Sequence, residues 1–240
     1  MKAVRRFLWV ALALAASAQE STSIYYVVFL RPDPARKPIA KEEGDRMQNA
    51  HMANIHKMAD EGLLAAAGPF ENDPPPISGI FVMKAKSIGD AQRIAGEDPT
   101  VREHRNTAEV HAWRGPAGIG DEYFRLHKEH PETPENMGVQ PILLVARGAA
   151  WNATAPKERV VLLAGHQHYV DELQRAGNLG AAGPVEGESG MMGIVIFHRI
   201  PLEEAQQLIA EDPAVKAGVV SVEAHRWWSS DHVLPWRAAR

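Results

Sequence analysis

The sequence lacks cysteine entirely across its 240 residues. No disulfide can therefore hold the fold, and no thiol can serve as a nucleophile or a metal ligand. The HExxH, CxxC, phosphate-loop and GxSxG motifs are also missing, because the glycines and serine at 187–190 have the wrong spacing for the last of these. These absences disfavour zinc and serine hydrolases, and they leave packing as the source of stability.

A concentrated positive charge is missing as well. The 26 Lys and Arg residues are outnumbered by 30 Asp and Glu, and they are scattered along the chain rather than clustered. Proteins that bind a phosphate backbone normally carry clustered positive charge. We therefore expect no nucleic-acid partner.

Long apolar runs are absent, apart from a short one near the start of the chain. Residues 7–16 are apolar, but about ten residues are too few to span a bilayer. Basic residues precede this run at positions 2–6, and the small residues Ala16-Ser17-Ala18 follow it. This order is typical of a secretory signal. We expect residues 1–18 to be cleaved and the mature protein to be soluble and periplasmic or secreted, without a membrane partner.

An internal repeat dominates the rest of the chain. Residues 51–70 recur as residues 166–185 with seven of twenty positions identical, where unrelated sequences would share roughly one. A second block pairs residues 91–101 with residues 205–215. The sequence therefore predicts one module written twice.

The repeat predicts the domain boundaries. The modules should span 22–114 and 139–230, joined by a linker at 115–138 and followed by a tail at 231–240. Each is close to 100 residues, a usual size for a domain. A short helix is expected within the linker, near residues 121–128.

Each module shows the pattern βαββαβ. A buried strand is followed by a helix that ends at glycine, a hairpin, a second helix that ends at an Asp-Pro pair, and a closing strand. In the first copy these lie at 24–30, 41–62, 64–70 with 77–86, 87–98 and 104–113. The fold class is α+β, with two ferredoxin-like sheets whose bare faces cover each other in one barrel. We expect a monomeric pseudo-dimer, with a homodimer of chains as the alternative.

Three marks recur in each copy and together resemble the YCII-related domain family. They are a helix-borne His followed after sixteen residues by Gly-Pro, the pattern A-Q-x4-E-D-P, and a closing strand with tryptophan. The resemblance covers nearly the whole mature chain. It implies the dimeric α+β barrel form of the ferredoxin-like fold, small-molecule chemistry of no single type, and a His/Asp active site. By position, the site residues are His51 with Asp98 and His166 with Asp212.

The histidines lie on the apolar stripes of their helices. A neutral imidazole there can act as a general base, and a nearby carboxylate can fix its tautomer. The alternative is a packed core histidine beside an aspartate that only forms the turn at the helix end. Asp60 is a competing partner for His51, but the second copy has Arg175 in its place.

The closing strands carry a second group of candidates. A Glu, a His and a Trp alternate along each strand, so that each triplet shares one face of its sheet. The residues are Glu109, His111 and Trp113 in the first copy and Glu223, His225 and Trp227 in the second. We expect this face to line the barrel interior and bind a small molecule. The alternative is an exposed face of an edge strand.

Together these features predict an exported small-molecule enzyme that uses His/Asp acid-base chemistry of the isomerase, lyase or dehalogenase type. We expect no cofactor. We also expect no metal, since His127 and His130 in the linker lack further ligands. The competing hypotheses are a non-catalytic periplasmic small-molecule binding protein and a structural or partner-binding module. In the second copy, His168 and Asp171 are additional polar groups, so the two sites can have diverged.

Overall fold

The computed structural model describes residues 21–71, 77–187 and 190–235. The predicted secretory signal at 1–18 lies outside this part of the chain. The first module contains β1 (Thr22–Pro32), α1 (Lys41–Asp60), β2 (Leu64–Glu71), β3 (Gly79–Met83), α2 (Ile88–Gly96), α3 (Pro99–Arg102) and β4 (Asn106–Pro116). The connector carries α4 (Asp121–Glu129). The second module contains β5 (Met137–Arg147), α5 (Pro156–Arg175), β6 (Leu179–Glu186), β7 (Met191–Phe197), α6 (Leu202–Ala210), α7 (Pro213–Lys216) and β8 (Val220–Ser230), followed by the 3-10 turn η1 (Asp231–Val233).

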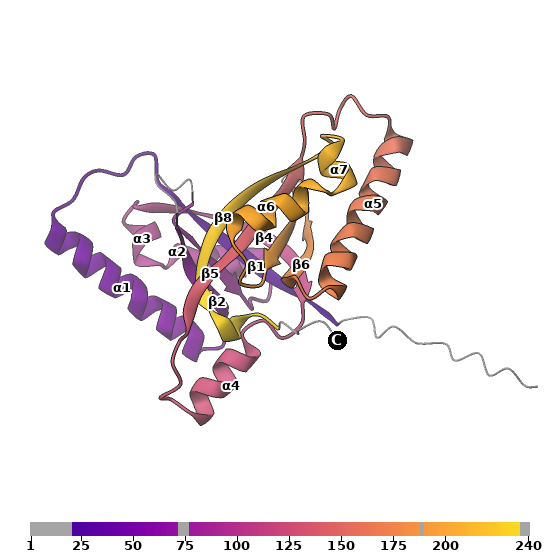
Figure 1. The fold of residues 1–240 in the computed structure, drawn as a ribbon. Helices are drawn as coiled ribbons and strands as arrows, with labels where there is room; N and C mark the ends of the chain where they lie inside the picture. Colours follow the sequence, from indigo (N-terminus) through magenta and orange to yellow (C-terminus); the bar gives the residue numbers. More distant parts are fainter. Residues whose placement is uncertain (1–20, 72–76, 188–189, 236–240) are drawn as a thin grey trace, which may run out of the picture.

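The eight strands form one closed antiparallel barrel in the order β1-β3-β2-β8-β5-β7-β6-β4. Because the barrel is closed, β4 neighbours β1, and the four strands of each module lie side by side. The modules join where β2 pairs with β8 and where β4 pairs with β6. The helices lie outside, with α1 and α5 on opposite sides of the barrel (Figure 1). The predicted α+β barrel within one chain is confirmed.

Short-range signals set the ends of the long helices. Gly62 and Gly177 follow α1 and α5 with φ of +69° and +77°, a backbone conformation that glycine adopts without steric cost. Ser87 begins α2, because its side chain accepts a hydrogen bond from the Asp90 backbone N–H.

The Asp-Pro pairs have a different role from the predicted one. The helices α2 and α6 end two residues before them, and Asp98 and Asp212 each cap the beginning of a further short helix, α3 or α7. Proline at the first helical position suits this geometry, because its missing N–H would have no partner there. The prediction that these pairs terminate the preceding helix was therefore incomplete, because it missed the new turn of helix.

The barrel interior is filled by side chains from both modules. Trp113, Trp227 and Phe29 are fully buried in one apolar cluster with Ile142 and Leu144. Two further clusters lie between the helices and the outer face of each half of the sheet. The connector and the tail add to the core, since Ile119 and Leu234 are also buried in the interior cluster.

Glycines permit the close approach at both junctions between the modules. A Cβ added to Gly68 would lie 1.8 Å from the carbonyl oxygen of Trp228, and one added to Gly183 would lie 1.9 Å from that of Arg114. Both obstacles are backbone atoms in a closed sheet, so they cannot move aside as a side chain would. The Gly-Pro mark of each copy is therefore the place where the barrel closes.

Replacing either junction glycine should open or strain the barrel. We expect Gly68→Ala and Gly183→Ala each to lower the free energy of unfolding by about 3 kcal/mol or more, because the new methyl group overlaps backbone. Gly96→Ala is the matched control, since its Cβ would meet nothing within 4 Å. Urea denaturation checks this, and equal stabilities for Gly68→Ala and the control would contradict it.

Candidate functional site

Each module brings its helix histidine to its aspartate. The Nδ1 of His51 lies 2.8 Å from Oδ2 of Asp98, and the Nδ1 of His166 lies 2.6 Å from Oδ2 of Asp212. Both aspartates are fully buried, while the histidine side chains keep 14% and 17% exposure. The paired residues come from α1 with α3 and from α5 with α7.

The first carboxylate is held by several donors. Its Oδ1 accepts the Thr100 backbone N–H at 2.9 Å and the Thr100 hydroxyl at 2.6 Å, and its Oδ2 also accepts the Asn54 amide at 3.0 Å. Burial alone would raise the pKa of Asp98, but hydrogen bonds from His51 and Thr100 outweigh it and hold the pKa below its ordinary value. Asp98 is therefore ionised at neutral pH.

The ionised carboxylate sets the tautomer of the imidazole. A carboxylate can only accept hydrogen bonds, so Nδ1 of His51 must carry the proton. In the neutral ring, Nε2 is then left with a lone pair, and no described residue hydrogen bonds to it. The arrangement can act as a general base with a fixed ring orientation.

The second carboxylate is held more simply. Asp212 accepts the backbone N–H groups of Ala214 and Val215 at 2.8 and 3.3 Å. Burial would again raise its pKa, and the hydrogen bond from His166 outweighs this and lowers it. By the repeat, Ala214 replaces Thr100 and Tyr169 replaces Asn54, so the extra side-chain donors exist at the first site alone.

Asp60 is not the partner of His51. It borders a separate hollow with Lys84 and Asp121, between α1 and α4. In the second module, the additional polar groups interact along α5 itself: His168 lies 3.4 Å from Glu172, and Asp171 accepts a hydrogen bond from Gln167.

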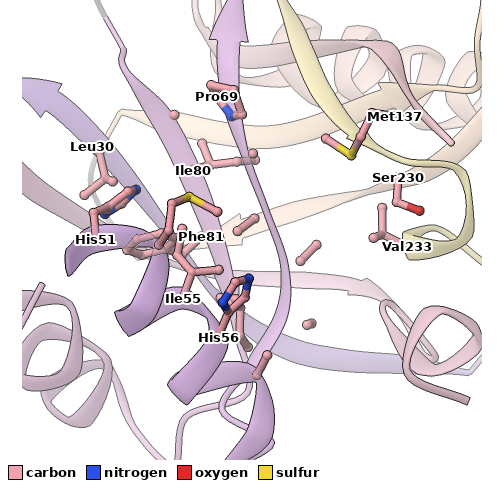
Figure 2. Close-up of a pocket in the computed structure, with 18 of the residues that line it drawn as sticks. Leu30, His51, Ile55, His56, Pro69, Ile80, Phe81, Met137, Ser230 and Val233 are labelled. Atoms are coloured by element: carbon pink, nitrogen blue, oxygen red, sulfur yellow. The ribbon is translucent and has the colours of Figure 1, made fainter. Parts of the chain in front are cut away.

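A cavity of about 510 Å³ opens beside His51, between α1 and strands β2 and β3, and its lining extends to residues of the interior cluster such as Ala65, Ile80 and Val233. Figure 2 shows His51, Ile55 and His56 on α1 at one side and Met137, Ser230 and Val233 at the other. The His51 ring stacks on Phe81, with ring centroids 5.9 Å apart. The lining is mostly apolar, as in many small-molecule sites.

A smaller cavity of about 290 Å³ opens beside His166. Its lining includes Arg114, Asp171 and Gln167. Arg114 forms an ion pair with Glu186. The two copies therefore share the His/Asp pair but offer different surroundings to a ligand.

A family model for the YCII-related domain matches residues 24–114 and again residues 142–228. The chain belongs to the YCII-related domain family. No curated protein sequence matches it significantly.

A solved structure shows that this YCII-related protein shares its fold with a distant protein. A mutant chlorite dismutase from Candidatus Nitrospira defluvii has a TM-score of 0.54 and 11% identity, covering 86% of this chain and 91% of its own. A heme-binding protein from Thermus thermophilus has a TM-score of 0.49 and 14% identity, covering 89% and 96%. At such low identity the first similarity concerns the fold alone.

The alternating triplets point into the barrel but do not line either His/Asp cavity. Trp113 and Trp227 are fully buried in the interior cluster, and His111 and His225 are buried at 6% and 3% exposure. Glu109 keeps 42% exposure and accepts hydrogen bonds from His111 and Arg31. Glu223 lies 3.0 Å from His225 and keeps 57% exposure.

The linker histidines have neighbours within the connector: His127 lies against Tyr123 and 3.9 Å from Glu135. His127 donates from Nδ1 to the Tyr123 carbonyl, and His130 lies 3.5 Å from Glu132. Within the described ranges, no group of three or more His, Asp or Glu side chains could hold a metal ion.

Sequence reasoning missed the side chains that complete the first site. A chain of hydrogen bonds runs from Ser78 through Asn106 and Thr100 to Asp98, with lengths of 2.9, 3.1 and 2.6 Å. Comparing the two copies could have found part of it, since Val220 stands where Asn106 stands in the first. The connector and tail residues that line the cavity have no counterpart in the repeat, so the sequence carried no signal for them.

The loss of folding stability in acid should depend on both buried carboxylates. The folded pKa values of Asp98 and Asp212 lie below the unfolded value, which is about 3.9. Their stabilisation is therefore complete above about pH 4 to 5 and is lost as the pH falls through the folded values.

The double variant Asp98→Asn/Asp212→Asn tests this origin. We expect it to be less stable than the native protein at pH 7 by about 2 to 5 kcal/mol and to show a flatter loss of stability below pH 5. Urea denaturation between pH 2 and pH 7 gives both quantities. An unchanged acid slope would assign the acid sensitivity to other groups.

Proposed function

We propose that this protein is a small-molecule enzyme in which His51 and Asp98 perform acid-base chemistry without a cofactor. The observation that carries the proposal is the buried, ionised carboxylate on Nδ1 of a histidine whose ring lines a mostly apolar cavity. The reaction classes that suit it are isomerisation, elimination and dehalogenation by loss of hydrogen halide, in the forms that begin with removal of a proton from carbon.

The residues would divide the reaction between them. Nε2 of His51 takes a proton from a substrate carbon, and the electron pair left behind forms a double bond as a neighbouring bond shifts or a leaving group departs. The imidazolium that results is stabilised by the Asp98 carboxylate, and it can return the proton at another carbon in an isomerisation. Asp98 orients the ring and does not move a proton itself.

The first site is the better candidate for catalysis. Its cavity is the larger of the two, and Asn54 and Thr100 hold its carboxylate in place. His166 and Asp212 would form a second site of the same type for a smaller or more polar molecule.

A heme does not fit the first cavity. His51 could offer Nε2 as an axial ligand, but the heme carboxylates also need cationic partners. The described residues that line the cavity include no Lys or Arg. A heme is therefore no part of the proposed reaction.

We also propose that the protein is exported and acts as a monomer. The residues at 1–18 carry the expectation of export, and the closed barrel supports the monomer because one chain supplies both halves. In the part of the chain that the structure describes, no helix is long and apolar enough to cross a membrane.

Exchange of substrate hydrogen for solvent deuterium tests the proposed base directly. Neutral cyclic and aromatic molecules, halogenated ones included, would be screened by mass spectrometry for turnover or deuterium uptake. For a molecule that reacts, we expect His51→Gln to lower the rate by about 100-fold or more. His166→Gln is the matched control and should change the rate less than threefold if the first site carries the reaction.

Two other outcomes would redirect the proposal. Unchanged turnover in the double variant His51→Gln/His166→Gln would refute it. A molecule could also bind the first cavity of the native protein and of the double variant with equal affinity, and undergo no turnover or exchange in either. That outcome would favour the non-catalytic binding protein.

A further inference from the structure

The connector between the modules brings a phenol and a carboxylate to the first cavity. Tyr123 on α4 and Glu135 before β5 both line it, and the Tyr123 hydroxyl donates to Oε1 of Glu135 at 2.8 Å. These groups come from outside the repeat, and the His/Asp mechanism does not use them. They deepen the proposed function, because they bear on which molecules enter the site.

Several contacts fix α4 in place. The Gly120 backbone N–H donates to the Val233 carbonyl at 2.7 Å, and Lys84 pairs with Asp121 at 2.7 Å. The Tyr123 ring lies 4.1 Å from the His127 ring, whose Nδ1 donates to the Tyr123 carbonyl at 2.9 Å. The phenol is therefore presented by a helix that is tied to both the first module and the tail.

The polarity of this end of the cavity is one-sided. Glu135 supplies a half-exposed acceptor whose Oε1 lies 3.9 Å from Nε2 of His127, and the described lining residues include no Lys or Arg. Burial, followed by the hydrogen bond to Glu135, raises the pKa of Tyr123, so the phenol remains a donor. A carboxylate or phosphate on a substrate would be repelled by the Glu135 carboxylate and would find no Lys or Arg to pair with among the described lining residues. A hydroxyl or amino group would find an acceptor in Glu135.

We propose that Tyr123 and Glu135 form a specificity subsite that selects an apolar molecule bearing a hydroxyl or amino group and rejects anions. The apolar body would lie against residues such as Ile55, Phe81 and Met137, within the same lining as the His51 ring. Glu135 would accept the hydrogen bond of the polar group, and Tyr123 would position the carboxylate.

The second cavity lacks this subsite. Its lining has Thr22, Arg114 and Pro116 from the ends of β1 and β4, and the described residues there include no tyrosine and no glutamate. Selection against anions should therefore be a property of the first cavity alone.

Binding of four matched probes tests the subsite without knowledge of the substrate. Benzylamine, benzyl alcohol, toluene and benzoate share one ring and differ in the polar group. Each would be titrated into isotope-labelled protein, with amide NMR shifts read around α1, β2 and β3. We expect benzylamine and benzyl alcohol to bind the native protein about tenfold more tightly than benzoate.

Variants then assign the preference to its residues. Glu135→Gln should reduce the advantage of benzylamine over benzoate to less than threefold, and Tyr123→Phe should weaken benzyl alcohol binding severalfold. Asp171→Asn in the second cavity is the control and should leave both values unchanged. Equal binding of all four probes, a preference that Glu135→Gln does not alter, or no shifts at these amides would overturn the subsite.

The subsite and the proposed chemistry can fail separately. His51→Gln removes the base but leaves Glu135 in place, so the probe preference should persist in that variant. Loss of the preference in Glu135→Gln together with unchanged turnover in His51→Gln/His166→Gln would support the subsite and refute the base. A preference that persists in Glu135→Gln, together with lost turnover in His51→Gln/His166→Gln, would support the base and refute the subsite.

Discussion

The barrel depends on two places where a glycine of one module meets the last strand of the other. Gly68 and Gly183 leave room for the carbonyl oxygens of Trp228 and Arg114, and no larger residue would fit without moving backbone. Closure there buries Trp113 and Trp227 in an interior shared by both modules. A four-stranded sheet with helices on one side would otherwise leave an apolar face in water, so neither module could bury its sheet alone.

Closure also decides where chemistry can occur. Large side chains fill much of the interior, and the cavities open beside the two long helices, the first reaching past β2 to interior residues such as Ile80 and Val233. The histidine of each His/Asp pair lies on one of these helices beside its cavity, and the duplication of the module produced one pair in each copy. The connector helix α4 is single, however, and its residues line the first cavity and not the second. One asymmetric segment on a symmetric barrel therefore makes a large apolar site at one end and a small charged one at the other.

The sequence predicted the features that repeat and missed those that do not. Strand order, glycine-terminated helices and the His51/Asp98 pair followed from periodicity, from turn chemistry and from resemblance to a family. The extra helix at each Asp-Pro was missed because proline signals a helix start as well as a helix end. Tyr123 and Glu135 could not be placed, since their position depends on how α4 packs against the tail. The Glu/His/Trp face was expected in the interior, where Trp113 lies fully buried.

The proposed base requires that Asp98 hold His51 with Nδ1 protonated and Nε2 free to accept a proton. Long-range nitrogen-proton correlation NMR on the neutral ring distinguishes the two tautomers directly. The account predicts the Nδ1–H tautomer for His51, and a shift toward a mixture in Asp98→Asn, where the carboxylate no longer requires a donor. A neutral His51 that carries its proton on Nε2 in the native protein would contradict the account, because that nitrogen could not then act as a base.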